Sequence, residues 1–217
     1  MMETREISPV QRLMIATAGR RREQAEQIVA LDNECAHIAQ SAREPMMAQI
    51  RLAWWRDGLA SAEALPAHRS PMMDGLRAVE GFAAMRPGLI ALVDGWEELI
   101  LWGGEEPQAM LEAYAAGRGG GLFAAFAPEQ GETARLWGQV WALWDLAGHL
   151  SEADLAAAAI ARGQRLAHDL PGAGALPRML TMLARAARHD LVRGRGMPPS
   201  LTPGLYMRLL RLQIFGR

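Results

Sequence analysis

Residues that favour β-strands are scarce along this chain, and this limits its possible folds more than any other feature. Val, Ile and Thr are few and do not alternate with polar residues. Ala, Leu, Met, Arg and Glu, which favour helices, dominate instead. Pro and Gly interrupt the helix-favouring stretches at regular intervals. The sequence therefore predicts an all-α fold.

The prolines and glycines divide the chain into expected helices joined by short loops. Pro at positions 45, 71, 107 and 203 marks expected helix starts, where a missing N–H does no harm. Nothing marks an internal domain boundary, so we expect one domain over residues 1–217, with 1–7 and 195–203 as loops. The expected helices are 8–19, 22–41, 45–62, 71–84, 87–102, 105–127, 130–150, 152–169, 174–194 and 203–215.

Composition excludes several classes of function. The formal net charge is −1, so a basic surface for non-specific nucleic-acid binding is not expected. Every one of the 23 basic residues is arginine, which excludes the lysine of a P-loop or a Schiff base. The single cysteine, Cys35, excludes an internal disulfide. No apolar stretch reaches the roughly 18 residues of a membrane span and no signal peptide is recognisable, so we expect a cytoplasmic protein.

The segment with the most specific pattern is Arg43-Glu-Pro-Met-Met-Ala-Gln-Ile-Arg-Leu-Ala-Trp-Trp-Arg-Asp-Gly-Leu59. In a helix, Met47, Ile50 and Trp54 would form one apolar stripe, with Arg51 beside it. This pattern is typical of a core helix. We therefore expect Arg51 to be partly buried and paired with an acid.

The same segment resembles the squalene/phytoene synthase family, in its short bacterial branch. Four further segments fit that resemblance. Ala30-Leu-Asp-Asn-Glu-Cys-Ala-His-Ile38 precedes the segment, which is followed by Leu92-Val-Asp-Gly-Trp96, Glu112-Ala-Tyr-Ala-Ala-Gly-Arg-Gly-Gly-Gly-Leu122 and Leu205-Tyr-Met-Arg-Leu-Leu-Arg-Leu212. The resemblance implies an isoprenoid-synthase-like helical bundle around a central cavity. Active members of the family hold Mg²⁺ with two Asp-rich motifs on facing helices, and the metal withdraws diphosphate from a prenyl substrate.

The sequence departs from the family at both metal motifs. The first motif falls near Ala36, His37 and Gln40, none of which is a carboxylate. At the second, Asp145 replaces the usual Asn, while His149 and Ala153 replace aspartates. Because Mg²⁺ disfavours imidazole ligands, we interpret the metal site as lost and expect no cofactor.

Two helical pairs and one aromatic row supply the remaining candidates. Asp145 and His149 share a helix face, as an acid–base pair or as an ordinary surface pair. Tyr114 and Arg118 share another face and precede three glycines, which suggest a kink or close packing. Trp137, Trp141 and Trp144 fit a core seam or an isoprenoid pocket. The candidate binding residues are Arg51, Trp54, Tyr114, Arg118, Trp141, Asp145 and His149.

We therefore expect a binding or assembly protein without diphosphate chemistry, its cavity filled by Trp54, Trp141 and Trp144. A mitochondrial complex I assembly factor of the same family also lacks the metal motifs, which is an analogy of fold. Two alternatives remain open. One is an active, Mg²⁺-dependent prenyl transferase that uses Asp94, Glu97 and Glu98. The other is a peripheral isoprenoid- or lipid-binding protein. The partner would be a protein or an isoprenoid or lipid, and the basic C-terminal helix could contact an anionic membrane or simply pack on the bundle.

Overall fold

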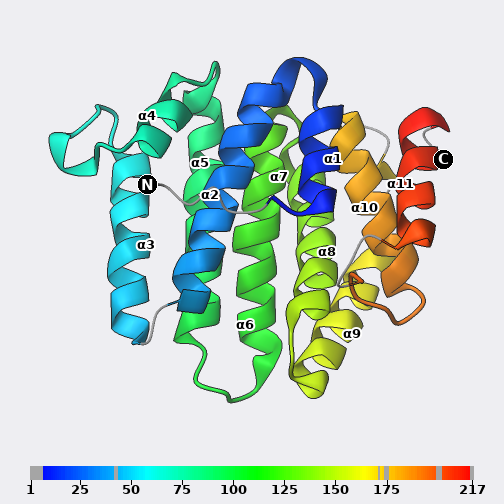
Figure 1. The fold of residues 1–217 in the computed structure, drawn as a ribbon. Helices are drawn as coiled ribbons and strands as arrows, with labels where there is room; N and C mark the ends of the chain where they lie inside the picture. Colours follow the sequence, from blue (N-terminus) through cyan, green and yellow to red (C-terminus); the bar gives the residue numbers. More distant parts are fainter. Residues whose placement is uncertain (1–6, 42–43, 171, 174–175, 199–201, 216–217) are drawn as a thin grey trace.

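The computed structural model describes residues 7–41, 44–170, 172–173, 176–198 and 202–215, and within these every regular element is a helix. The predicted all-α class is confirmed. The helices pack side by side as a bundle (Figure 1). They are α1 (Pro9–Thr17), α2 (Arg22–Ser41), α3 (Pro45–Ala60), α4 (Pro71–Ala78), α5 (Phe82–Leu101), α6 (Pro107–Tyr114), α7 (Gly121–Phe126), α8 (Gly131–His149), α9 (Ala153–Asp169), α10 (Arg178–Leu191) and α11 (Pro203–Phe215).

Helix starts follow the sequence signals closely. Prolines stand in the first turn of α1, α3, α4, α6 and α11, so all four predicted proline starts are confirmed. Ser70 accepts a hydrogen bond from the Met73 backbone N–H and caps α4. At α1, the Ser8 side chain caps the Gln11 N–H and Gln11 reciprocates, forming a capping box. The segment 1–6, expected as part of a loop, lies outside the described residues.

One predicted break falls at the wrong place. The expected helix over 71–84 ends at Ala78, and the next begins at Phe82 rather than at position 87. Gly81, with φ of +82°, provides the left-handed turn between them. Pro87 therefore lies inside α5, where it removes one helical hydrogen bond. The glycine, and not the proline, separates the two helices.

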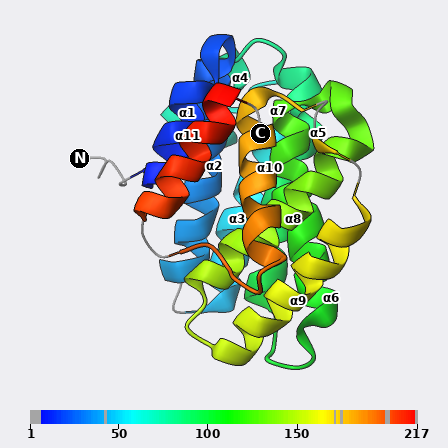
Figure 2. The same ribbon diagram turned by 90° about the vertical axis from the view of Figure 1, so that its right-hand side faces the viewer.

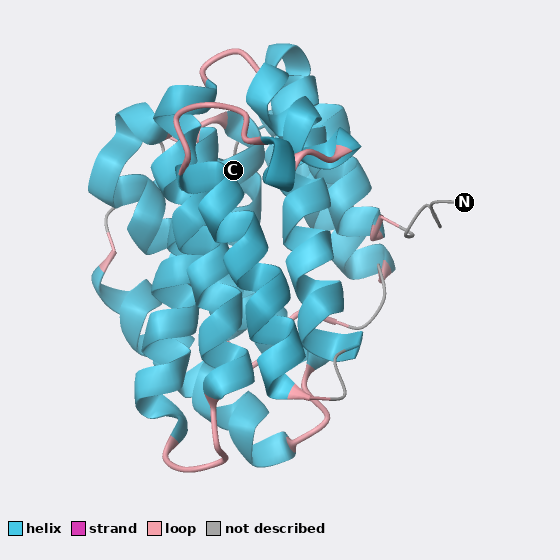
Figure 3. Ribbon diagram, turned by 90° about the vertical axis from the view of Figure 1, so that its left-hand side faces the viewer, coloured by secondary structure: helices cyan, strands magenta, loops and turns pink. Residues whose placement is uncertain are grey.

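The centre of the bundle is one long helical column made of α6, a π-helical segment η3 (Ala115–Gly120) and α7. This column lies between α5 and α8, whereas α3 lies at one edge of the bundle and α10 and α11 lie at the other (Figure 1). Figure 3 shows the α3 edge, where loops connect the helix ends. The position of α6–η3–α7 places its π-helical segment in the middle of the protein.

Close packing on both sides fixes the π-helical segment. A Cβ at Gly95 of α5 would collide with the Arg118 backbone, and a Cβ at Gly138 of α8 would collide with the Gly119 backbone. Glycines on the column and on its neighbours therefore let three helices approach to backbone contact. Of the two readings of the three glycines, a kink or close packing, the close packing is confirmed. Because π-bulges change the direction of the side chains that follow them, this segment can aim one residue inward.

Candidate functional site

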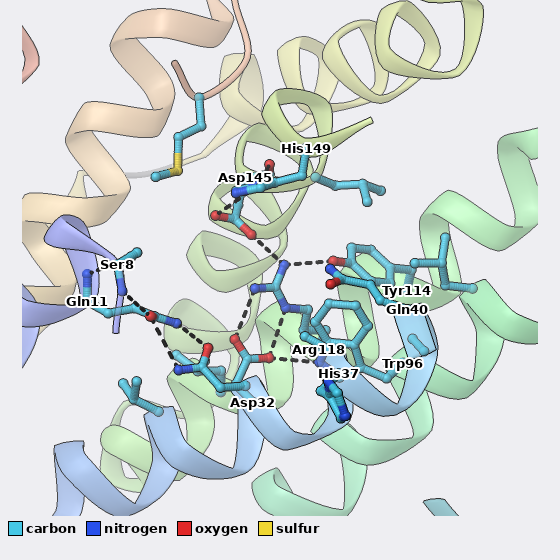
Figure 4. A pocket seen from close by; sticks show the side chains of 18 of the residues that line it. Ser8, Gln11, Asp32, His37, Gln40, Trp96, Tyr114, Arg118, Asp145 and His149 are labelled. Carbon is cyan, nitrogen blue, oxygen red and sulfur yellow. Dashed lines mark hydrogen bonds and ion pairs between the residues drawn. The ribbon is translucent and has the colours of Figure 1, made fainter. Parts of the chain in front are cut away.

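A cavity of about 670 Å³ lies between α1, α2, α5, η3 and α8, a size within the range of small-molecule sites. Its wall is partly apolar, and polar groups gather along α2 and α8 (Figure 4). The lining residues are Ser8, Val10, Gln11, Met14, Val29, Asp32, Asn33, Ala36, His37, Ala39, Gln40, Pro45, Ala48, Trp96, Leu99, Ile100, Tyr114, Arg118, Leu122, Trp141, Asp145, Leu146, His149, Leu150, Leu183 and Met197.

Arg118, on the π-helical segment, is the central polar group of the cavity. Its Nε and Nη2 donate to the two carboxylate oxygens of Asp32 on α2, each at 2.9 Å. Its Nη1 donates to Asp145 on α8 and to the Tyr114 hydroxyl, each at 2.6 Å. One guanidinium thus links three helices, and Figure 4 shows it between the two carboxylates. We call Asp32, Arg118, Asp145 and Tyr114 the Arg118 cluster.

Aromatic rings enclose the Arg118 cluster. The guanidinium carbon lies 4.6 Å from the Trp96 ring centroid and 4.9 Å from that of Trp141, which are cation–π distances. Trp96 also donates its indole N–H to Asp32 at 2.8 Å. Each charged group is therefore both hydrogen-bonded and shielded from water, as burial requires.

The ionisation of the cluster follows from this geometry. Burial alone would lower the pKa of Arg118, but Asp32, Tyr114 and Asp145 reverse the effect and raise the pKa above its usual value. Burial also raises the pKa of Tyr114, which stays a neutral donor and acceptor. With two carboxylates and one guanidinium, the cluster carries a formal charge of −1.

Exposed polar side chains form the rim of the cavity. His37 and Gln40 on α2 and His149 on α8 line it and reach solvent. His149 lies 2.8 Å from the Asp145 backbone oxygen through Nδ1, but 3.9 Å from the Asp145 carboxylate. Asp145 instead binds Arg118 more closely. The acid–base interpretation of Asp145 and His149 is therefore not supported by their geometry.

Five of the seven predicted binding residues meet at this cavity: Tyr114, Arg118, Trp141, Asp145 and His149. The expected first-motif positions Ala36, His37 and Gln40 also line it, whereas Ala153 starts α9 and does not. The positions of α2 and α8 that the resemblance singled out therefore face this cavity, apart from Ala153.

Arg51 and Trp54 do not belong to the site, and the prediction for α3 was wrong. Met47 and Ile50 are exposed, because the buried face of α3 is Ala48, Leu52, Trp55 and Leu59. Arg51 is an exposed residue, with a side chain 43% exposed, so the expected burial beside an apolar stripe is wrong. It does pair with Glu34 at 3.3 Å, as expected.

Trp54 packs on the outside of the bundle. It donates its indole N–H to the Ala67 carbonyl and stacks on His68, with ring centroids 5.4 Å apart. The expectation that three tryptophans fill the cavity was wrong as well. Trp141 borders an open space, Trp144 is fully buried outside the cavity lining, and Trp54 is remote.

Sequence reasoning missed two members of the site, Asp32 and Trp96. Asp32 lies one helical turn before Ala36, where the family motif falls, yet it holds Arg118. Its signal was present: it lies on the apolar face that Ile28, Leu31 and Cys35 share, and an acid on such a face needs a buried cation. Trp96 carries no such signal, because its contact with Asp32 depends on how α5 packs against α2.

No protein-family model, curated protein or solved structure matches this chain. Among the residues that the structure describes, no group of three or more His, Cys, Asp or Glu side chains could hold a metal ion. In the same part of the chain, no helix is both long and apolar enough to cross a membrane.

Proposed function

We propose that this chain is a squalene/phytoene synthase-like binding protein that takes a neutral, amphipathic ligand of isoprenoid type into the central cavity, without Mg²⁺-dependent diphosphate chemistry. The observation that carries the proposal is the open cavity of about 670 Å³ whose buried charged groups are already hydrogen-bonded to one another. Protein interiors do not usually leave such space unfilled. An apolar wall with a few polar groups suits a ligand with a long apolar body and one neutral polar end.

Charge argues against a diphosphate ligand. Among the lining residues that the structure describes, Arg118 is the one guanidinium; it is held by two carboxylates, and the Arg118 cluster has an excess of negative charge. Along this described lining, a diphosphate would meet no arginine that is free of a carboxylate. A divalent cation that bridged Asp32 and Asp145 would first have to displace Arg118 from hydrogen bonds of 2.6–2.9 Å. We therefore propose that Arg118 itself neutralises the two facing carboxylates.

The alternative acidic set is engaged elsewhere. Arg56 of α3 binds Asp94 of α5 at 2.6 Å and also Glu97. Neither acid lines the cavity, nor does Glu98. These positions do not support an active prenyl transferase built on Asp94, Glu97 and Glu98.

The test compares a neutral with an anionic ligand of the same chain length. Farnesol is expected to raise the melting temperature saturably, because a ligand at a hundredfold excess over its Kd adds about 2.7 kcal/mol. Farnesyl diphosphate is expected to bind more weakly, and with Mg²⁺ it should release pyrophosphate only at background. No shift with farnesol, or pyrophosphate release abolished by EDTA, would contradict the proposal.

A matched pair of variants tests whether the cavity is the site. Ala36→Phe places a ring in the cavity lining, whereas Ala60→Phe adds the same ring at an exposed position of α3. Farnesol should stabilise Ala60→Phe as it does the wild type and should fail to stabilise Ala36→Phe. Equal stabilisation of both variants would place the ligand outside this cavity.

A second candidate, an assembly factor that binds a protein partner, is favoured by the outer surface of α3. Met46, Met47 and Ile50 are 67%, 51% and 56% exposed and lie within two turns of one another. A photocrosslinking residue at position 47 is expected to give one discrete protein adduct in cells. The same residue at the exposed Leu101 serves as the control. Adducts of equal pattern at both positions would argue against a specific partner.

A further inference from the structure

Charge is distributed very unevenly along the sequence. Residues 171–217 contain eight arginines and one acid, Asp190, whereas residues 1–170 contain fifteen arginines and 23 acids. The near-neutral total therefore hides a C-terminal segment with a formal charge of +7 and a remainder of −8. This segment forms α10, the turn after it and α11, which lie together on one side of the bundle (Figure 2).

The one acid of this segment is not available at the surface. Asp190, at the end of α10, is 4% exposed. Its Oδ1 accepts hydrogen bonds from Arg195 at 3.1 Å and from Arg208 of α11 at 2.7 Å. His189 Nδ1 lies 3.2 Å from the same oxygen. We call these four residues the Asp190 cluster. Because Arg195 and Arg208 meet at one oxygen, the turn after α10 lies against α11.

Exposed apolar side chains accompany the arginines here. Val192, in the turn, is 61% exposed and is followed by the exposed Arg193. On α11, Tyr206 and Met207 are 46% and 52% exposed, and the exposed Arg211 follows Met207 by one helical turn. Within the described residues, neither Arg193 nor Arg211 forms an ion pair. We call Val192, Arg193, Tyr206, Met207 and Arg211 the basic apolar surface.

We propose that the basic apolar surface docks on an anionic lipid membrane. Arginines that approach lipid phosphates while neighbouring apolar groups enter the interface are the combination that peripheral membrane binding requires. The acidic remainder of the chain would be repelled by the same membrane and so would orient the protein with α10 and α11 toward it. A nucleic acid would use the arginines but would leave Val192, Tyr206 and Met207 without a role. This proposal does not depend on a ligand in the cavity.

Co-sedimentation with vesicles tests the proposal directly. The protein is expected to bind vesicles of phosphatidylcholine and phosphatidylglycerol, to release them as salt is raised, and to bind pure phosphatidylcholine weakly. Arg193→Gln/Arg211→Gln should weaken binding about 30-fold, since each cation near an anionic surface contributes about 1 kcal/mol. Tyr206→Ser/Met207→Ser should also weaken binding, without changing its salt dependence.

The control removes the same charge elsewhere. Arg20→Gln/Arg135→Gln neutralises two exposed arginines outside the segment and should bind as the wild type does. Thermal melts matching the wild type show that each variant is folded. Equal binding to neutral and anionic vesicles, or equal loss in the control, would overturn the proposal. Tighter binding to a DNA or RNA duplex than to vesicles, lost in Arg193→Gln/Arg211→Gln, would replace the membrane by a nucleic acid.

Discussion

The Arg118 cluster and the Asp190 cluster are both built from arginine–aspartate ion pairs, but the ratio of arginine to aspartate is opposite. The first places one guanidinium between two carboxylates, with both Asp32 and Arg118 almost fully buried. The second places one buried carboxylate between two arginines whose side chains are 26% and 55% exposed. The first joins helices that are distant in the sequence, whereas the second joins the consecutive helices α10 and α11. One lies in the centre of the bundle and the other at its edge.

The difference in ratio determines what each region can attract. An excess of acid among buried, aromatic-lined groups disfavours anions and retains its cation. An excess of arginine at an open edge leaves positive charge at the surface. Burial also determines how much free energy is lost when an ion pair is broken. Breaking a buried pair leaves an uncompensated charge, whereas water can replace part of the lost interaction in a half-exposed pair. The comparison can be tested by removing one member of each cluster.

The largest effect is expected from Arg118→Met, which leaves two carboxylates facing each other without their cation. Loss of one partner from a buried pair typically costs about 3–5 kcal/mol, a large part of a normal folding free energy. Urea denaturation measures the loss. The double variant Asp32→Asn/Arg118→Met should recover part of it, because the two changes are coupled. Additive losses in the double variant would show that the pair is not coupled.

A smaller and more local effect is expected from Asp190→Asn. The substitution keeps the shape but removes the charge that Arg195 and Arg208 share, at a cost of about 1–3 kcal/mol. Hydrogen exchange should accelerate in α11 and in the turn after α10, while α2 and α8 keep their protection. Uniform acceleration throughout the bundle would show that α11 does not open separately and would remove the distinction between the two clusters.

Much of the fold could be predicted, because prolines and caps act locally. Pro45, Pro71, Pro107 and Pro203 marked true helix starts, since a missing N–H costs nothing in a first turn. The positive charge of residues 171–217 is equally legible from sequence, but only when charge is counted by segment rather than over the whole chain.

The parts that could not be predicted depend on which helix face meets a neighbour. The sequence of α3 offers two apolar stripes, and the choice of Leu52 and Trp55 over Met47 and Ile50 is made by packing on α5. Likewise, Asp32 acquires its role only when Arg118, 86 positions further along the chain, approaches it from the π-helical segment. Long-range partners of this kind leave no local signature.

A third arginine cluster, centred on Arg56, extends the comparison of burial to the edge of the bundle at α3. Arg56 is 32% exposed and binds Asp94 and Glu97, whereas Arg51 is 43% exposed and pairs with Glu34 at 3.3 Å. Arg56→Ala should therefore lower the melting temperature by about 2–4 °C, corresponding to about 1 kcal/mol, and Arg51→Ala by less. Differential scanning calorimetry measures both. A larger effect of Arg51→Ala than of Arg56→Ala would contradict this order.

The smallest expected effect uses Cys35 as a reporter of the region around the Arg118 cluster. Its thiol is completely buried on α2. Burial raises the pKa of the thiol well above its usual value, and the nearby charges of Asp32 and Glu34 raise it further. Native Cys35 should therefore react with iodoacetamide far more slowly than the unfolded chain does at pH 8. Labelling should accelerate in Arg118→Met but not in Asp190→Asn, because only the first disturbs the packing of α2. Acceleration in both variants would mean that the two clusters report one opening event.

The same raised pKa values predict a loss of stability at alkaline pH. Both Cys35 and Tyr114 keep their protons longer in the folded state than in the unfolded state. Their contribution is therefore complete below about pH 8.5, the ordinary pKa of a thiol, and declines as pH rises and the unfolded chain ionises first. Urea midpoints measured from pH 7.5 to 10.5 should fall. In Cys35→Ala the fall should begin later, near the ordinary tyrosine value of 10.0, because Tyr114 alone then remains. An unchanged onset in Cys35→Ala would show that the thiol ionises no earlier in the unfolded chain than in the folded protein and does not contribute to the alkaline loss.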